Sequence, residues 1–174
     1  IYTNYCDPSP DCYCDQQYTH GYGRFDLAMT LGLSEYLDPL NSGVDAAVKK
    51  GYVDENNLFV TGGSGGGVLT AWIVSHTDRF AAAASQKPVI NWYSWVLTAD
   101  MGGTGGLNYW FPDTPWNALE HYMDRSPIHH VANVKTPTML ITGEVDWRTP
   151  MSESEQFYQA LKIQQIPSAL VRIP

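Results

Sequence analysis

The protein has 174 residues, with 10 Lys and Arg against 18 Asp and Glu, which gives a formal net charge of −8. This length suits a single domain with its own core, and 44 % hydrophobic residues exclude a wholly disordered chain. No apolar run approaches the roughly 20 residues of a membrane-spanning helix. An acidic chain without a Lys/Arg cluster cannot neutralise phosphates, so we expect neither nucleic acid nor a membrane as partner.

The N-terminal stretch is predicted to be a loop. Residues 4–23 carry several prolines and glycines and no hydrophobic period. Cys6, Cys12 and Cys14 lie in this stretch, and His20 would complete four zinc ligands. The two-residue step from Cys12 to Cys14 is tighter than the usual spacing of zinc ligands, so we favour free or paired thiols in a loop. No metal and no other cofactor is expected.

The rest of the chain alternates between predicted strands and helices. We expect strands over residues 58–60, 81–84, 138–141 and 168–173. We expect helices over residues 25–37, 44–48, 68–76, 126–131 and 152–162, and a long connection over residues 92–116. The last helix is predicted to start at a capping box of Ser152 and Glu155. This alternation predicts an α/β fold with a mainly parallel sheet, in one domain over residues 1–174.

A glycine-rich turn follows the first of these strands. Gly62, Ser64 and Gly66 match G-x-S-x-G, the pattern of a nucleophile elbow between a strand and a helix. Such a turn holds the serine in a strained backbone conformation and needs flanking residues without a Cβ. The N–H of Gly65 would then stabilise an oxyanion. A dinucleotide loop and a P-loop both fail, because apolar residues follow the last glycine where those motifs require Gly or Lys.

A serine of this kind needs an acid and a histidine base. Asp146 follows the strand over residues 138–141 and is the favoured acid, with Glu144 from the same loop as its competitor and a solvated loop carboxylate as the alternative. In this fold the histidine comes last along the chain, whereas all five histidines precede Asp146. We expect His129 and His130 to have surface or capping roles. An imidazolium at His76 would complement a helix dipole, and the base is expected beyond residue 174.

Two segments resemble the catalytic domain of the prolyl oligopeptidase family, especially its acylaminoacyl-peptidase-like and dipeptidyl-peptidase-like members. They are residues 43–96, with VTGGSGGGVLTAW, and residues 126–161, with TGEVDWRTP. The resemblance implies an α/β-hydrolase fold, Ser64 as nucleophile, Asp146 as triad acid and Gly65 as oxyanion donor. It also implies that Trp92 and Trp95 line a pocket for an apolar substrate side chain, with plain core packing as the alternative.

The chain departs from the family pattern in several places. The His-Gly-Gly-Pro loop, the Gly-Ser-x-His segment and the N-terminal β-propeller have no counterpart in it, and residues 5–20 form an unmatched insertion. We therefore expect a partial domain, truncated at both ends and inactive by itself. The full-length protein is expected to be a serine peptidase acting on short peptides. An esterase or lipase of the same fold and a non-catalytic module are the alternatives, and neither compartment nor oligomeric state is indicated.

Overall fold

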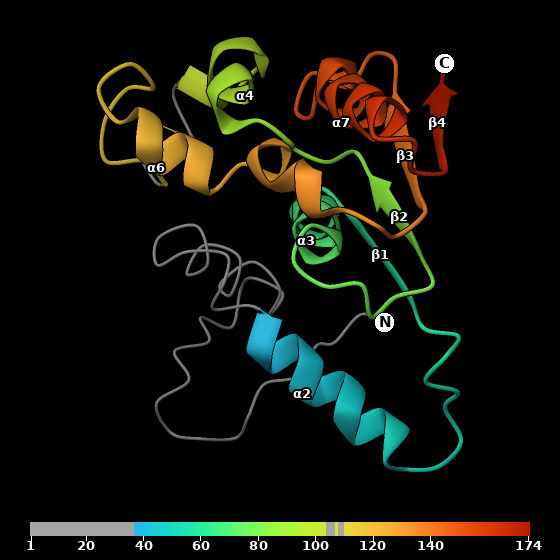
Figure 1. The fold of residues 1–174 in the computed structure, drawn as a ribbon. Coiled ribbons are helices and arrows are strands. Elements are labelled where there is room, and N and C mark those ends of the chain that lie inside the picture. Colours follow the sequence, from blue (N-terminus) through green and yellow to red (C-terminus); the bar gives the residue numbers. More distant parts are fainter. Residues whose placement is uncertain (1–36, 104–106, 108–109) are drawn as a thin grey trace, which may run out of the picture. The chain divides into compact units, whose positions relative to one another are not determined.

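The computed structural model describes residues 37–103, 107 and 110–174 (Figure 1). The expectations for the N-terminal loop, the three cysteines, His20 and the helix over residues 25–37 lie outside these residues. The chain divides into two compact units, Ile1–Val53 and Asp54–Pro174.

The described part of the first unit contains one helix, α2 (Leu37–Val48). The helix predicted over residues 44–48 is thus confirmed, and it begins seven residues earlier than expected. Beyond its last turn the chain reaches Gly51, whose N–H donates to the carbonyl of Val48 at 2.9 Å. Gly51 has a φ of +81°, a left-handed conformation that glycine adopts without steric cost, which explains why the helix stops here.

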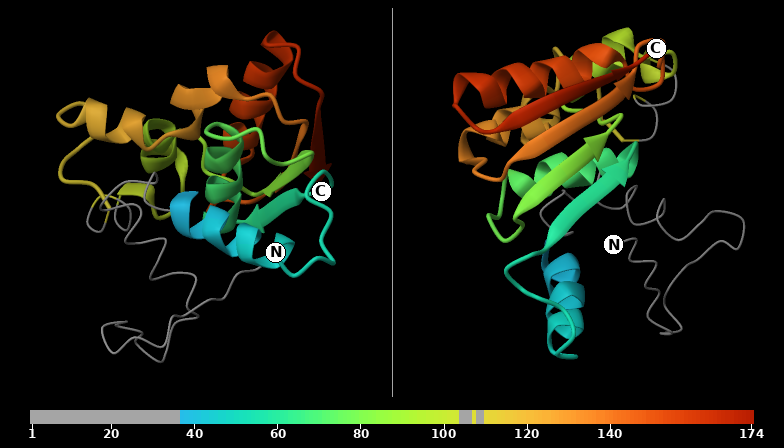
Figure 2. Two further views of the ribbon diagram at one scale, coloured as in Figure 1. Left: turned by 60° about the horizontal axis from the view of Figure 1, so that its bottom comes forward. Right: turned by 90° about the vertical axis from the view of Figure 1, so that its right-hand side faces the viewer.

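The second unit contains a four-stranded parallel sheet. Its strands are β1 (Phe59–Gly63), β2 (Ala82–Gln86), β3 (Thr138–Gly143) and β4 (Ser168–Ile173), and their order in the sheet is β1-β2-β3-β4. Figure 2 shows the four arrows side by side and pointing the same way. The carboxyl ends of all four strands therefore meet at one edge of the sheet, and the predicted parallel arrangement is confirmed.

Three helical elements form a layer on this sheet. Helix α3 (Gly65–Val74) packs on β1 and β2, α7 (Met151–Ile163) packs on β3 and β4, and the 3₁₀ helix η3 (Pro127–Asn133) contacts both helices. The buried core between the layers consists of Ala71, Val74, Ala83, Ile90, Val134, Leu140, Phe157 and Leu161. No helix in the described ranges is long and apolar enough to cross a membrane.

Two further helices were not predicted. Helix α4 (Trp92–Thr98) occupies the start of the stretch that the sequence predicts as a long connection, and α6 (Leu119–Asp124) follows that stretch. The side chain of Asn91 explains α4, because its Oδ1 accepts hydrogen bonds from the backbone N–H groups of Tyr93 and Ser94. This is the bonding pattern of an N-cap, which satisfies donors that have no partner within the helix.

The predicted capping box is wrong. Helix α7 starts at Met151, with Pro150 as its N-cap residue, so Ser152 already lies inside the first turn. Proline fixes φ near the helical value and has no N–H to satisfy, which suits it to the start of a helix. Glu155 points elsewhere and forms an ion pair with Arg172 of β4 at 3.2 Å.

Candidate active site

Ser64 lies between β1 and α3 in a strained conformation. Its φ is 57° and its ψ is −119°, a combination that non-glycine residues rarely adopt. The backbone N–H of Ser64 donates to the carbonyl of Gln86, at the end of the neighbouring strand β2, at 3.0 Å. The strained strand-to-helix turn expected from the motif is therefore present at residue 64.

The glycines around Ser64 differ in what they contribute. A Cβ at Gly62 would lie 2.5 Å from the carbonyl oxygen of Gly66, and one at Gly67 would lie 2.4 Å from that of Gln86. Both positions therefore require glycine. A Cβ at Gly66, by contrast, would meet no described atom within 4 Å. The expectation that both motif glycines must lack a Cβ holds for Gly62 but not for Gly66, and the second steric requirement falls on Gly67.

The hydroxyl of Ser64 has no hydrogen-bond partner among the described residues, and it makes no capping bond to α3. Gly65 is the first residue of α3, and the first N–H groups of a helix have no carbonyl partner within it. A hydroxyl and a backbone donor are thus adjacent at the positive end of a helix, where negative charge is stabilised.

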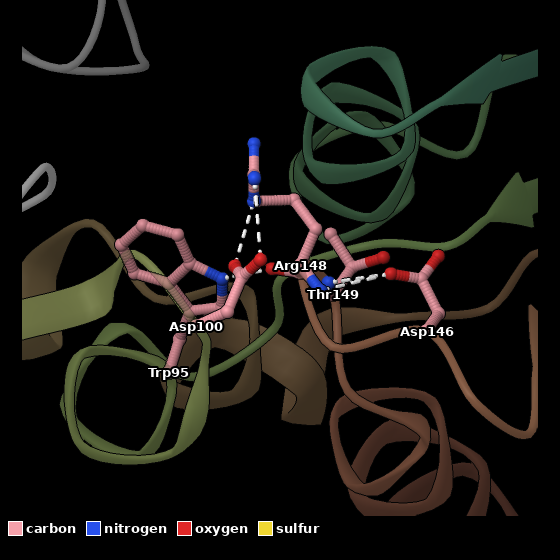
Figure 3. A network of polar contacts seen from close by, with 5 residues as sticks. All are labelled: Trp95, Asp100, Asp146, Arg148 and Thr149. Carbon is pink, nitrogen blue, oxygen red and sulfur yellow. Dashed lines mark hydrogen bonds and ion pairs between the residues drawn. The ribbon is translucent and has the colours of Figure 1, made fainter.

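Asp146 is held in the loop that follows β3. Its Oδ1 accepts hydrogen bonds from the backbone N–H groups of Arg148 at 3.0 Å and Thr149 at 2.9 Å (Figure 3). No described residue donates to Oδ2, so this oxygen can accept a bond from an imidazole. The competing Glu144 is paired with Arg172, with Oε1 3.0 Å from Nε, on the exposed surface beside β4.

Two residues from the α4 region support this acid loop, which we define as residues 144–149. The indole N–H of Trp95 donates to the carbonyl of Arg148 at 2.7 Å. The carboxylate of Asp100 binds the Arg148 guanidinium, with distances of 2.7 Å from Nε to Oδ1 and 3.2 Å from Nη2 to Oδ2 (Figure 3). The hydrogen bond from Arg148 lowers the pKa of Asp100 and raises the pKa of Arg148. The backbone N–H of Asp100 also donates to the carbonyl of Trp147 at 2.9 Å.

The sequence did not indicate this support. Asp100 and Arg148 are 48 residues apart in the chain, and an isolated aspartate or arginine carries no periodic or motif signal of its partner. Asp100 follows α4, the helix that the sequence analysis missed. An N-cap assignment for Asn91 was the available signal, because it would have placed α4 and therefore the position of its C-terminal end.

Known proteins are similar to this chain in sequence and in fold. The family model described as the prolyl oligopeptidase family matches residues 24–174. The chain belongs to the prolyl oligopeptidase family. Its structure resembles that of an acylaminoacyl peptidase from Pyrococcus horikoshii with a TM-score of 0.79 and 25 % identity, over 90 % of this chain and 25 % of that one. The fold is therefore that of an α/β-hydrolase peptidase, as the sequence predicts.

Relatives in other organisms match as well. The protein named "Uncharacterized peptidase YuxL" of Bacillus subtilis (strain 168) is 40 % identical over 174 residues, which cover 93 % of this chain and 25 % of that protein. The acylamino-acid-releasing enzyme of Arabidopsis thaliana is 35 % identical over 126 residues, covering 68 % of this chain and 16 % of that enzyme. The chain thus spans a quarter or less of the length of these relatives.

The two tryptophans that the family resemblance places in a substrate pocket are both buried. Trp92 is 1 % exposed and Trp95 2 % exposed, with their rings 5.1 Å apart in an edge-to-face arrangement. The indole N–H of Trp92 donates to the carbonyl of Arg125 at 2.9 Å, and that of Trp95 donates to Arg148. These contacts agree with the alternative that both tryptophans pack in the core. A role in substrate binding stays a prediction.

The described histidines take part in other contacts. The ring of His76 stacks on Trp72 with centroids 4.0 Å apart, and its Nδ1 lies 2.8 Å from the Trp72 carbonyl. Partial desolvation lowers the pKa of His76, which works against the imidazolium expected at the helix end. The Nε2 atom of His130 is hydrogen-bonded to the carbonyl of Asp124, and the Nε2 atom of His121 to the carbonyl of Trp110. No hydrogen bond among the described residues joins a histidine to Ser64 or Asp146.

The described residues offer no evident metal site. Among them, no three His, Cys, Asp or Glu side chains are grouped so that they could hold a metal ion.

Proposed function

We propose that the protein is a serine peptidase that hydrolyses short peptides by acyl transfer, with Ser64 as nucleophile and Asp146 as the acid of a triad. The histidine is supplied by a part of the protein outside residues 1–174. One observation carries the proposal: a strained serine at the end of β1 shares a sheet edge with a carboxylate whose Oδ1 is held by two backbone N–H groups and whose Oδ2 has no described donor.

The topology supports the placing of the two groups. Ser64 follows β1 and Asp146 follows β3, with β2 between these strands. Neighbouring strands lie about 4.8 Å apart, so the two strand ends are separated by roughly 10 Å. Both residues follow the carboxyl ends of their strands and so lie at the same edge of the sheet. An imidazole ring that bonds Asp146 through one nitrogen and Ser64 through the other fits an interval of this size.

Each residue then has a defined task. The hydroxyl oxygen of Ser64 attacks the substrate carbonyl while the histidine takes its proton, and the N–H of Gly65 stabilises the negative charge on the carbonyl oxygen. Asp146 accepts the other imidazole N–H, which fixes the tautomer and stabilises the imidazolium. The histidine returns the proton to the leaving amine. Water then attacks the acyl-enzyme by the same route and releases the acyl group.

Peptides are the substrate class that the relatives favour. One similar structure is an acylaminoacyl peptidase in complex with Z-Gly-Gly-Phe-chloromethyl ketone; it has a TM-score of 0.73 and 28 % identity, over 79 % of this chain and 22 % of that one. The Arabidopsis relative is named for the release of acylamino acids. We propose the same general substrate class for this protein, namely short peptides and acyl peptides.

Hydrolysis of peptide anilides by the full-length protein tests the proposal. S64A is expected to lose several orders of magnitude in kcat, because removal of a triad member leaves only the contributions of binding and the oxyanion donors. A fluorophosphonate probe should label the wild type and not S64A. Unlabelled wild type would instead favour a non-catalytic module. Faster turnover of matched esters than of amides, with negligible amide cleavage, would favour an esterase.

The same assay applies to residues 1–174 alone. They should not hydrolyse the anilide, because the proposed base is missing. Serine-dependent turnover by this piece would contradict a base located elsewhere in the protein.

A further inference from the structure

A second carboxylate near the site has no role in the triad. Glu153 lies in the first turn of α7 and is completely buried. Its Oε2 accepts hydrogen bonds from the backbone N–H groups of Ile90 at 2.9 Å and Asn91 at 2.8 Å. Its Oε1 accepts from the hydroxyl of Ser94 and from the amide of Gln156 at 3.4 Å. The carboxylate thus has four donors, of which three belong to the segment that enters α4.

Among the described residues, the backbone N–H groups of residues 90–94 donate to side chains and not to other backbone groups. The N–H groups of Ile90 and Asn91 bind Glu153, the N–H of Trp92 binds the hydroxyl of Ser126 at 3.0 Å, and those of residues 93 and 94 bind the side chain of Asn91. Five consecutive backbone donors are therefore satisfied by side chains. Buried backbone donors need partners, so the path of this segment depends on these three side chains.

The same segment is connected to the acid loop. Helix α7, which carries Glu153, begins two residues after Thr149, the residue whose N–H donates to Asp146. From the other side, Trp95 and Asp100 bind Arg148. Glu153 therefore joins the start of α4 to the helix that leaves the acid loop, while Trp95 and Asp100 join the rest of α4 to the loop itself.

Keeping a charge at this position has a cost. Burial raises the pKa of Glu153, and the bonds from Ser94, Asn91, Ile90 and Gln156 act in the opposite direction. None of the ion pairs between described residues involves Glu153. A buried carboxylate without a cationic partner is unfavourable unless every oxygen is hydrogen-bonded, as it is here.

We propose that Glu153 is a positioning residue for the peptidase reaction: its carboxylate fixes residues 90–94 against α7, so that the substrate-facing segment and Asp146 keep a constant relative position. The inference rests on the proposed function, because the resemblance to the family is what places Trp92 and Trp95, and with them this segment, beside the substrate. Glu153 acts through the backbone that it holds and does not touch the reacting atoms.

Steady-state kinetics of the full-length protein on a peptide anilide test this role. E153A removes all four acceptor contacts and should raise KM about tenfold or more, with a smaller change in kcat, because charge-assisted bonds to the substrate-facing segment are lost. E153Q keeps an oxygen that can accept from both backbone N–H groups and should restore KM to within about threefold of wild type. A generally destabilised enzyme would not show this pattern of KM increase and rescue.

Two variants serve as controls. E155Q changes a glutamate on the same helix that pairs with Arg172 at the surface, and it should leave KM unchanged. S94A removes only one donor to Oε1 and leaves both backbone bonds in place, so it should raise KM by less than E153A does. If E153A does not fold, E153D gives the same readout, since the shorter side chain withdraws the carboxylate from the two backbone donors.

The outcomes separate this inference from the proposed function. A KM for E153A equal to that of E155Q, with S64A inactive, overturns the role of Glu153 and leaves the peptidase proposal intact. A KM for E153Q as high as that of E153A also overturns the role of Glu153, because the two backbone hydrogen bonds would then not explain the effect on KM. Full activity of S64A would instead overturn the proposed function.

Discussion

The serine turn and the acid loop reach their geometry in different ways. The turn is fixed by close backbone contacts around it: Gly62 against Gly66 within the turn, and Gly67 against the carbonyl of Gln86 on the adjacent strand. The acid loop is fixed by side chains from α4 and just beyond it, 48 to 53 residues earlier in the chain. Local sterics leave a recognisable motif in the sequence, whereas distant hydrogen bonds do not. Four substitutions, two of them with a matched control, probe this difference.

The largest effect is expected for D146N. Asparagine keeps an Oδ1 that can accept from Arg148 and Thr149, so the loop should hold its shape. The NH₂ group that replaces Oδ2 cannot accept an imidazole N–H, and kcat should fall by about 10⁴-fold. Kinetics of the full-length protein measure the fall in kcat, and thermal unfolding tests whether the loop keeps its structure. Activity within tenfold of wild type, or a large drop in stability, would contradict this account of the loop.

The serine turn should respond to a single added methyl group. G67A would place a Cβ 2.4 Å from the carbonyl oxygen of Gln86, and we expect it to reduce the free energy of unfolding by about 1–3 kcal/mol. G66A is the matched control, because the added Cβ meets no described atom within 4 Å and alanine favours the helix by up to about 1 kcal/mol. Denaturant unfolding of both variants measures the difference. Equal stabilities would show that the turn is not fixed by local sterics.

The acid loop should respond to a change on α4. W95F removes the indole N–H that binds the carbonyl of Arg148, and W92F removes the one that binds Arg125. The two rings are equally buried, so each substitution should cost about 1–3 kcal/mol of stability. Only W95F should also lower kcat, because only Trp95 contacts the acid loop. Equal kcat values for the two variants would show that the hydrogen bond from Trp95 does not determine the position of the acid loop.

The smallest effect is expected at the Asp100–Arg148 pair, which lies on the surface. The hydrogen bond from Arg148 lowers the pKa of Asp100. The ionised carboxylate therefore contributes its full stabilisation at pH values above 3.8, the usual pKa of an aspartate. It is lost as the pH falls from there through the lowered pKa. Thermal unfolding of wild type and D100N should therefore differ slightly at neutral pH and converge in acid. A difference that grows in acid would have the wrong sign.

Much of the fold could be predicted from the sequence, for identifiable reasons. The strands at residues 138–141 and 168–173 are apolar runs, and their parallel pairing follows from the helices between them. The strained turn at Ser64 could be recognised because the steric requirement at Gly62 appears directly as residue type. Asp146 could be chosen because it follows a strand at the same sheet edge.

The parts that failed depend on side chains far apart in the chain. Helix α4 starts in an aromatic stretch with no apolar period, and its N-cap, Asn91, was not recognised. Glu153 was not considered because the periodicity of α7 makes it one more polar residue near a helix start, while three of its four partners are 59 to 63 residues away. The capping box of Ser152 and Glu155 fitted a motif, but the N-cap residue is Pro150, two residues before Ser152.

The positive φ of Ser64 has an evolutionary consequence. Glycine would adopt this conformation without strain, so selection for folding alone favours glycine at residue 64 over serine. A copy of this domain released from selection for catalysis would be free to acquire that glycine and gain stability while losing its nucleophile. A serine retained at this position across diverging copies would therefore be evidence of continued selection for chemistry.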